Sequence, residues 1–75
     1  MPKLPRTTGR KAIRALEQMG FVQVRQRGSH ITLKRETDEG VTGCTVPAHD
    51  EIAIGTLRSI LRQAQVTPEE FMENL

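Results

Sequence analysis

Two alternating segments, residues 21–27 and 30–34, flank the dipeptide Gly28-Ser29. Alternation of apolar and polar side chains is typical of a strand with one buried face, and a two-residue break that contains glycine is typical of a tight hairpin turn. The pattern therefore predicts an antiparallel β-hairpin. The side chains expected to face the core are Val22, Val24, Ile31 and Leu33.

A third strand is expected after the polar, turn-rich segment at residues 36–40. From Val41 to Pro47, Cys44 and Val46 alternate with polar or small residues, so they join the buried side of a three-stranded antiparallel sheet. Strand parity places a second group on the opposite side or its edges. Its members are Arg25, Arg27, His30, Lys34 and Thr45. We therefore expect His30 to lie among cations, outside the apolar core.

Two amphipathic helices are expected to cover the apolar side of this sheet. Apolar side chains recur at helical spacing over residues 9–19, where Thr7-Thr8 can cap the first turn and Gly20 suits a left-handed C-terminal position. Residues 55–65 show the same helical periodicity. Both helices lie on one face of the sheet in this interpretation.

The C-terminus carries the signals of a short third helix. Thr67 can cap it, Pro68 suits the first helical position, and Glu70 completes a capping box. Phe71 and Leu75 are then expected to reach back to the core.

These elements predict one α+β domain over residues 1–75, with an α-β-β-β-α order followed by a short C-terminal helix. The only cysteine, Cys44, has no internal disulfide partner, and no paired Cys or His spacing suggests a structural zinc site. The N-terminus carries no signal-peptide run, and no segment approaches the ~20 apolar residues of a membrane span. We expect a cytoplasmic protein that needs no metal or cofactor.

Charge is divided unevenly along the chain. Residues 1–35 contain nine Lys or Arg and one acid, whereas residues 36–75 contain eight acids and two Arg, so the halves carry +8 and −6. A basic half favours a polyanion such as RNA as partner, although charged surfaces are also common on proteins that bind none. Because the chain has only two Phe and no Tyr or Trp, RNA binding is expected to depend on phosphate charge and shape rather than on base stacking.

The segment Arg25 to His30 is the candidate catalytic site. Histidine can accept and donate a proton near neutral pH, and arginine presents a fixed fork of donors to phosphate oxygens. These residues suit chemistry on a phosphate near neutral pH, with His30 as the group that transfers a proton. A surface histidine near a hairpin is the alternative interpretation.

Several residues are candidates to bind the RNA around His30. They are Arg25, Arg27, Gly28, Ser29 and Lys34, with Lys11 and Arg14 included if the first helix lies nearby. Gly28 supplies a backbone conformation or a close approach, and Ser29 either contacts phosphate or completes the turn. His49 is a second candidate acid or base, or else a structural or solvated histidine of the loop after Pro47.

Several motifs in order resemble the HicA family of toxin mRNA interferases. They are Gly9-Arg10-Lys11, Ala15 to Phe21, Arg25-Gln26-Arg27-Gly28-Ser29-His30, Thr45 to His49 and the segment from Gly55 to Ala64. The resemblance implies a double-stranded-RNA-binding-domain-like fold, mRNA cleavage and inhibition by a HicB-type antitoxin, with His30 as the catalytic histidine. The chain departs from the family pattern at Asp50-Glu51-Ile52 and at Gln65, where glycine is common.

Three classes of function remain open from the sequence. The favoured one is a metal-independent endoribonuclease toxin, monomeric when free. The second is a non-catalytic RNA-binding module with the same basic face, and the third is an interaction protein whose main partner is an acidic antitoxin. Substitution of His30 separates the first two, because only an enzyme loses its activity while RNA affinity is retained.

Overall fold

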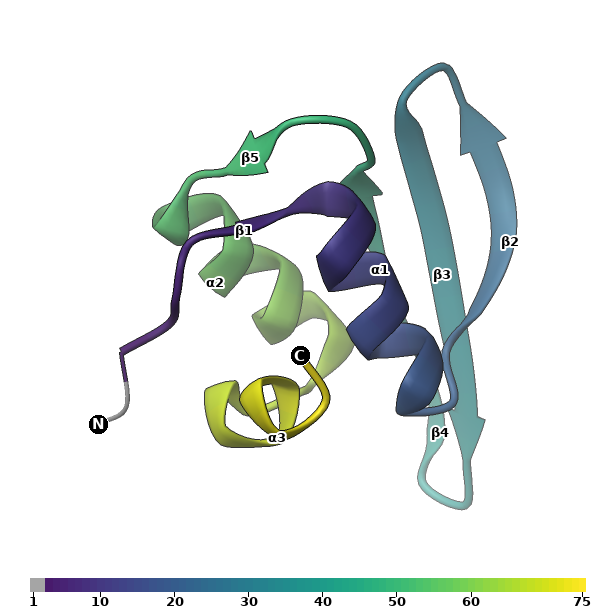
Figure 1. Cartoon of the computed structure of the whole chain (residues 1–75). Coiled ribbons are helices and arrows are strands. Elements are labelled where there is room, and N and C mark those ends of the chain that lie inside the picture. The colour runs from purple at the N-terminus through teal and green to yellow at the C-terminus, as the bar shows by residue number, and fades with distance from the viewer. Residues whose placement is uncertain (1–2) are drawn as a thin grey trace.

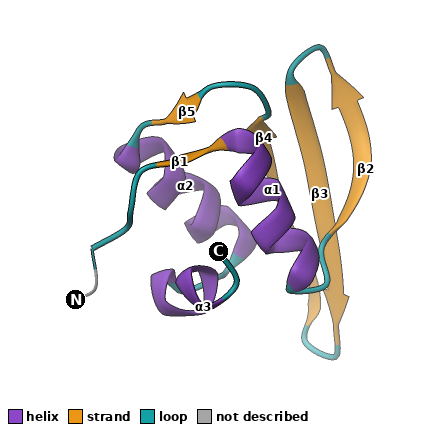
Figure 2. Cartoon of the chain, in the orientation of Figure 1, coloured by secondary structure: helices purple, strands orange, loops and turns teal. Residues whose placement is uncertain are grey.

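The computed structural model describes residues 3–75 and contains a sheet with helices on one side (Figure 1). The elements in chain order, distinguished by type in Figure 2, are β1 (Thr7–Thr8), α1 (Gly9–Gln18), β2 (Val22–Arg27), β3 (His30–Thr37), β4 (Gly40–Pro47), β5 (Glu51–Ile52), α2 (Ile54–Ala64) and α3 (Pro68–Glu73). None of the helices in this range is long and apolar enough to cross a membrane.

The main sheet is antiparallel with the strand order β2-β3-β4, and α1 and α2 lie on one side of it (Figure 1). The predicted α+β class, the α-β-β-β-α order and the short C-terminal helix are confirmed. A second sheet was not expected: Thr7 pairs with Ile52 and Thr8 with Glu51. Two-residue strands leave no periodic pattern in the sequence, so this pairing depends on the fold that brings the segments together.

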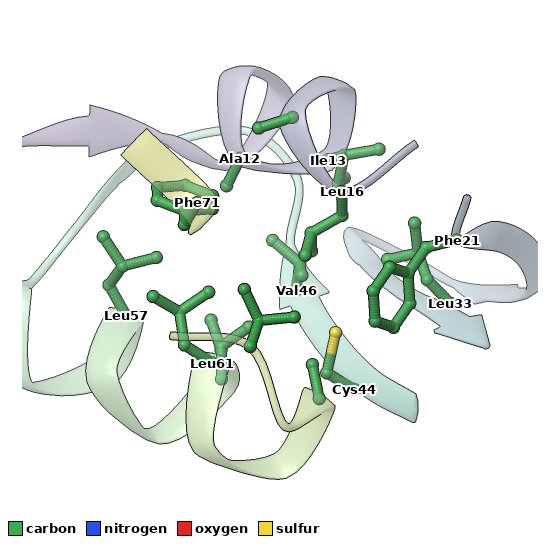
Figure 3. Packing of buried hydrophobic residues seen from close by; sticks show 14 of the residues in the cluster. Ala12, Ile13, Leu16, Phe21, Leu33, Cys44, Val46, Leu57, Leu61 and Phe71 are labelled. Carbon is green, nitrogen blue, oxygen red and sulfur yellow. The ribbon is translucent and has the colours of Figure 1, made fainter. Parts of the chain in front are cut away.

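The core lies between the sheet and the helices (Figure 3). Strand residues Ile31, Leu33, Cys44 and Val46 are buried, as predicted, and pack with apolar residues of all three helices. Phe71 is fully buried and confirms that α3 closes this core. Leu75, however, is 49% exposed, so the expectation that it reaches the core is wrong. It follows the C-cap Asn74, where the helix no longer directs its side chain inward.

The predicted capping residues are confirmed at both helix starts that the sequence marked. The Thr8 hydroxyl accepts a hydrogen bond from the Lys11 amide at 3.2 Å. Thr67 and Glu70 form the reciprocal capping box, in which the Glu70 amide donates to Thr67 Oγ1 at 3.1 Å. Gly20 has a φ of 99° after α1, as the left-handed position requires.

Val22 and Val24 are 62% and 52% exposed, so their predicted burial is wrong. The ladder with β3 shifts between Gln23 and Arg25, which is the signature of a β-bulge that inserts one extra residue into β2. The bulge reverses strand parity, so Val22 lies on the same face as Arg25. Because β2 is also an edge strand, β3 and β4 keep their alternation of buried and exposed side chains although neither valine is buried.

The second hairpin has a shorter loop than the predicted residues 36–40. The β3–β4 ladder continues to the pair Thr37 and Gly40, which leaves only Asp38 and Glu39 between the strands. Gly40 has a φ of 129°, and the Thr37 hydroxyl donates to the Gly40 carbonyl at 3.3 Å. The polar composition of residues 36–40 suggested a loop. Exposed strand ends are also polar, because they too are in contact with water.

Candidate RNA-binding and catalytic site

The side of the main sheet that faces away from the helices is called here the open face. The strand register arranges its side chains in rows that run across β2, β3 and β4. The rows are Arg27–His30–Pro47, Arg25–Thr32–Thr45 and Val22–Lys34–Gly43. Directly opposed side chains of an antiparallel pair have Cβ atoms about 4.5–5.5 Å apart. The ladder therefore brings Arg27 beside His30 and Arg25 beside Thr32.

A shallow hollow of about 410 Å³ opens on this face and is called the His30 hollow. It is lined by Arg25, Arg27, His30, Thr32 and Thr45. The two threonine hydroxyls are hydrogen-bonded across the strands, with their oxygens 3.1 Å apart. The sequence placed Thr45 on this face but gave neither threonine a role. Only the pairing register of β3 with β4 shows that Thr32 and Thr45 lie opposite each other.

The two arginines of the His30 hollow and His30 itself are exposed. Ion pairs among residues 3–75 occur only between Arg6 and Glu51 and between His49 and Asp50. The guanidinium groups in the hollow therefore have no carboxylate partner within that range, which leaves their donors free for phosphate oxygens.

The Gly28-Ser29 turn orients the beginning of β3. Gly28 has a φ of 54°, and a Cβ at this position would meet no atom within 4 Å. Glycine is therefore needed here for its backbone conformation and not for a close approach. A type II′ turn has a positive φ at its first central residue, which glycine adopts most easily. The Ser29 carbonyl accepts a hydrogen bond from the Ala48 amide at 2.7 Å, which ties the turn to the loop after β4.

The loop at residues 47–50 is held from its other side by the start of α1. The Gly9 amide donates to the Asp50 carbonyl at 3.0 Å, and a Cβ on Gly9 would overlap the Pro47 carbonyl oxygen. This close approach was not foreseen, because it joins segments 38 residues or more apart. It positions His49, which is exposed, 3.6 Å from the Asp50 carboxylate and outside the His30 hollow.

Lys11 and Arg14 were predicted to join the site only if the first helix lay nearby. Instead, α1 packs on the side of the sheet that carries the core residues Leu33 and Val46 (Figure 3). Both cations line another hollow, between α1 and the end of α3. The fold therefore separates them from the His30 hollow, whereas Lys34 lies on the open face one row beyond Thr32.

Arg35 belongs to the basic half of the chain but has a structural role. Its guanidinium carbon lies 4.6 Å from the centroid of the Phe21 ring, and its Nη1 donates to the Met19 carbonyl at 3.2 Å. A cation at a helix C-terminus is favoured by the helix dipole, so Arg35 fastens β3 to the end of α1 and is directed away from the open face.

Two other groups of chemical interest lie outside the open face. Burial raises the pKa of the Cys44 thiol to about 11, so this cysteine is a neutral core residue near pH 7. Within residues 3–75, no cluster of three His, Cys, Asp or Glu side chains is arranged to hold a metal ion.

Comparison with known proteins places the chain in a family. It matches the family described as HicA toxin of bacterial toxin-antitoxin over residues 9–66, a range that includes α1, the whole main sheet and α2. No curated protein matches the chain. The matched range contains every residue of the His30 hollow. The protein therefore belongs to the HicA toxin family of bacterial toxin–antitoxin systems, which implies a cognate antitoxin as its partner.

Proposed function

We propose that this toxin is a metal-independent endoribonuclease that cleaves mRNA, with His30 as its general acid or base. The observation that supports the proposal is the composition of the His30 hollow. One histidine shares an exposed cavity with Arg25, Arg27 and a pair of threonine hydroxyls. Phosphodiester cleavage in the absence of a metal needs a proton-transfer group and donors that stabilise the developing negative charge, and this hollow offers both.

In the proposed reaction, the ribose 2′-oxygen attacks the adjacent phosphorus and the bond from phosphorus to the 5′-oxygen breaks. The products are a 2′,3′-cyclic phosphate and a 5′-hydroxyl. His30 either removes the proton of the 2′-hydroxyl or supplies the proton that the 5′-oxygen takes up, and water serves the other transfer. General acid–base assistance by one group contributes typically about 10²–10⁴-fold in rate.

Arg25 and Arg27 are proposed to stabilise the extra negative charge on the phosphate oxygens in the transition state. Their place beside Thr32 and His30 in the ladder supports this role. Thr32 and Thr45 supply hydroxyls that can donate to phosphate or accept from the ribose. Lys34, one row further along the open face, is proposed to bind a neighbouring phosphate, and Gly28 and Ser29 to shape the turn that precedes His30.

We propose further that the HicB-type antitoxin inhibits the enzyme by covering the His30 hollow. Acidic side chains of the antitoxin would meet Arg25 and Arg27, and complementary charge would speed the encounter. An antitoxin bound elsewhere, with the hollow still open to RNA, would contradict this steric mechanism.

The test is cleavage of a labelled single-stranded RNA in EDTA by the wild type, His30→Ala and the matched control His49→Ala. We expect the wild type and His49→Ala to produce cyclic-phosphate ends, and folded His30→Ala to retain RNA affinity but lose cleavage by at least about 10²-fold. RNA binding without cleavage by any of the three would instead support the non-catalytic RNA-binding module. Loss of cleavage only in His49→Ala would assign the chemistry to the other histidine.

A further inference from the structure

The helix α2 carries two arginines that the proposed cleavage does not use. Arg58 and Arg62 are the only Lys or Arg residues of the acidic half of the chain, and both are exposed. Because they are four positions apart in one helix, they lie on the same side of it. Neither makes an ion pair within residues 3–75, and like charges at this spacing destabilise a helix.

Both arginines line a largely apolar cavity of about 500 Å³, called here the α2–α3 hollow. The buried core side chains of Leu4, Leu61 and Val66 form its floor. Pro68, Gln65 and Thr67 complete the lining. Its volume falls in the roughly 300–1,000 Å³ range of pockets that bind ligands. None of these lining residues is acidic, and none of them belongs to the His30 hollow.

The hollow results from the sharp turn between α2 and α3. Gln65 ends α2 in the left-handed conformation, with a φ of 57°, and the Val66 amide then donates back to the Leu61 carbonyl at 2.9 Å. Gln65 is the only residue other than glycine with a positive φ among residues 3–75. The chain thus keeps a side chain at a strained position on the edge of this hollow, where glycine would relieve the strain.

We propose that the α2–α3 hollow docks an acidic amphipathic segment of the partner antitoxin. Apolar side chains of that segment would enter the hollow, and carboxylates one helical turn apart would pair with Arg58 and Arg62. The family assignment implies an antitoxin, and the unpaired arginines select an acidic partner. The apolar lining favours a protein over RNA, because a phosphate backbone offers nothing apolar to bury there. The docking surface would add to the contact proposed over the His30 hollow.

Docking can be measured without RNA or cleavage, so its outcome is independent of the proposed enzyme activity. The probe is a synthetic helical peptide with Leu residues on one side and two Glu residues four positions apart, titrated into isotope-labelled His30→Ala protein. We expect saturable binding with chemical-shift changes centred on the methyl groups of Leu4, Leu61 and Val66. Binding should weaken as salt is raised.

The decisive variant is Arg58→Gln/Arg62→Gln, and its matched control is Arg10→Gln/Arg14→Gln. The control removes the same charge from two exposed arginines at the same spacing on α1. We expect the α2 variant to bind the Glu peptide about three- to tenfold more weakly, the sum expected for two exposed ion pairs, and the α1 control to bind like the parent protein. The charge-reversed Arg58→Glu/Arg62→Glu protein should prefer a peptide with Lys at the two positions.

Three kinds of result would overturn the proposal. The first is no saturable binding of the Glu peptide, or equal binding by the α2 variant. The second is a loss of RNA affinity in the α2 variant as large as that in Arg25→Gln/Arg27→Gln, which would assign the arginines to RNA. The third is a dimer in sedimentation that Arg58→Gln/Arg62→Gln dissociates, which would make a second copy of the chain the occupant.

Discussion

At Gly9, the start of α1 lies directly against the backbone of the loop after β4. A methyl group there would overlap the Pro47 carbonyl oxygen and lie 2.8 Å from the carbonyl carbon of Ala48. Both are backbone atoms, so α1 and the loop after β4 must separate. We expect Gly9→Ala to lower the free energy of unfolding by about 2–3 kcal/mol in urea denaturation.

Gly55 provides the matched control for this substitution. It lies in the first turn of α2, and a Cβ there meets nothing within 4 Å. Gly55→Ala should leave the free energy of unfolding unchanged or raise it by up to about 1 kcal/mol, because alanine favours the helix. Equal losses in the two variants would show that the Gly9 contact is not the cause.

Cys44 is expected to make stability depend on alkaline pH. Its thiol has a pKa of about 11 in the fold against 9.0 for the exposed group, because burial disfavours the thiolate. The folded state therefore holds the proton more tightly, and this contribution is complete below pH 9 and is lost as the pH rises towards 11. Over that interval, the wild type should lose about 1–2 kcal/mol more unfolding free energy than Cys44→Ala. Parallel pH profiles in chemical denaturation would contradict this assignment.

At the scale of elements, substitution by glycine is expected to change the free energy of unfolding in opposite directions at two positions near the end of α2. Gln65→Gly relieves the positive φ of 57°, and we expect a gain of about 0.5–1 kcal/mol after the entropic cost of glycine. Gln63→Gly, on the exposed surface inside the same helix, should lose about 1 kcal/mol. Thermal and urea unfolding of both variants measure the difference. A loss in both would mean that the turn after α2 is not strained.

At the scale of the whole molecule, the fold divides the cations of the basic half between two sides. Arg25, Arg27 and Lys34 lie on the open face, whereas Lys11 lies beyond α1. Each phosphate contact with a single strand contributes about 0.7 to the slope of log affinity against log salt. We therefore expect Arg27→Gln to reduce that slope for RNA by about 0.7 and Lys11→Gln to leave it unchanged, as measured by fluorescence anisotropy. Equal reductions would place RNA across both sides.

Much of the fold could be predicted because its signals are local. The helix periodicities, the Thr8 cap, the Thr67–Glu70 box and the Gly28-Ser29 turn all involve residues within four positions of one another. Parity within β3 was enough to place His30, Thr32 and Lys34 on the face opposite Ile31 and Leu33. The bulge in β2 could not be read from this pattern, since an extra residue in one strand is defined only by its pairing with another.

The three helices, the three strands of the main sheet, their order, and one histidine among cations on an exposed sheet face all follow from the sequence alone. The tertiary structure alone decided the rest: the β1–β5 pairing, the contact of Gly9 with Pro47, the exposure of Val22 and Val24, and the separation of Lys11 and Arg14 from His30. It also formed both hollows, from residues distant in the chain. The physical reason is that periodicity and capping act over a few residues, whereas packing and strand register depend on which distant segments meet.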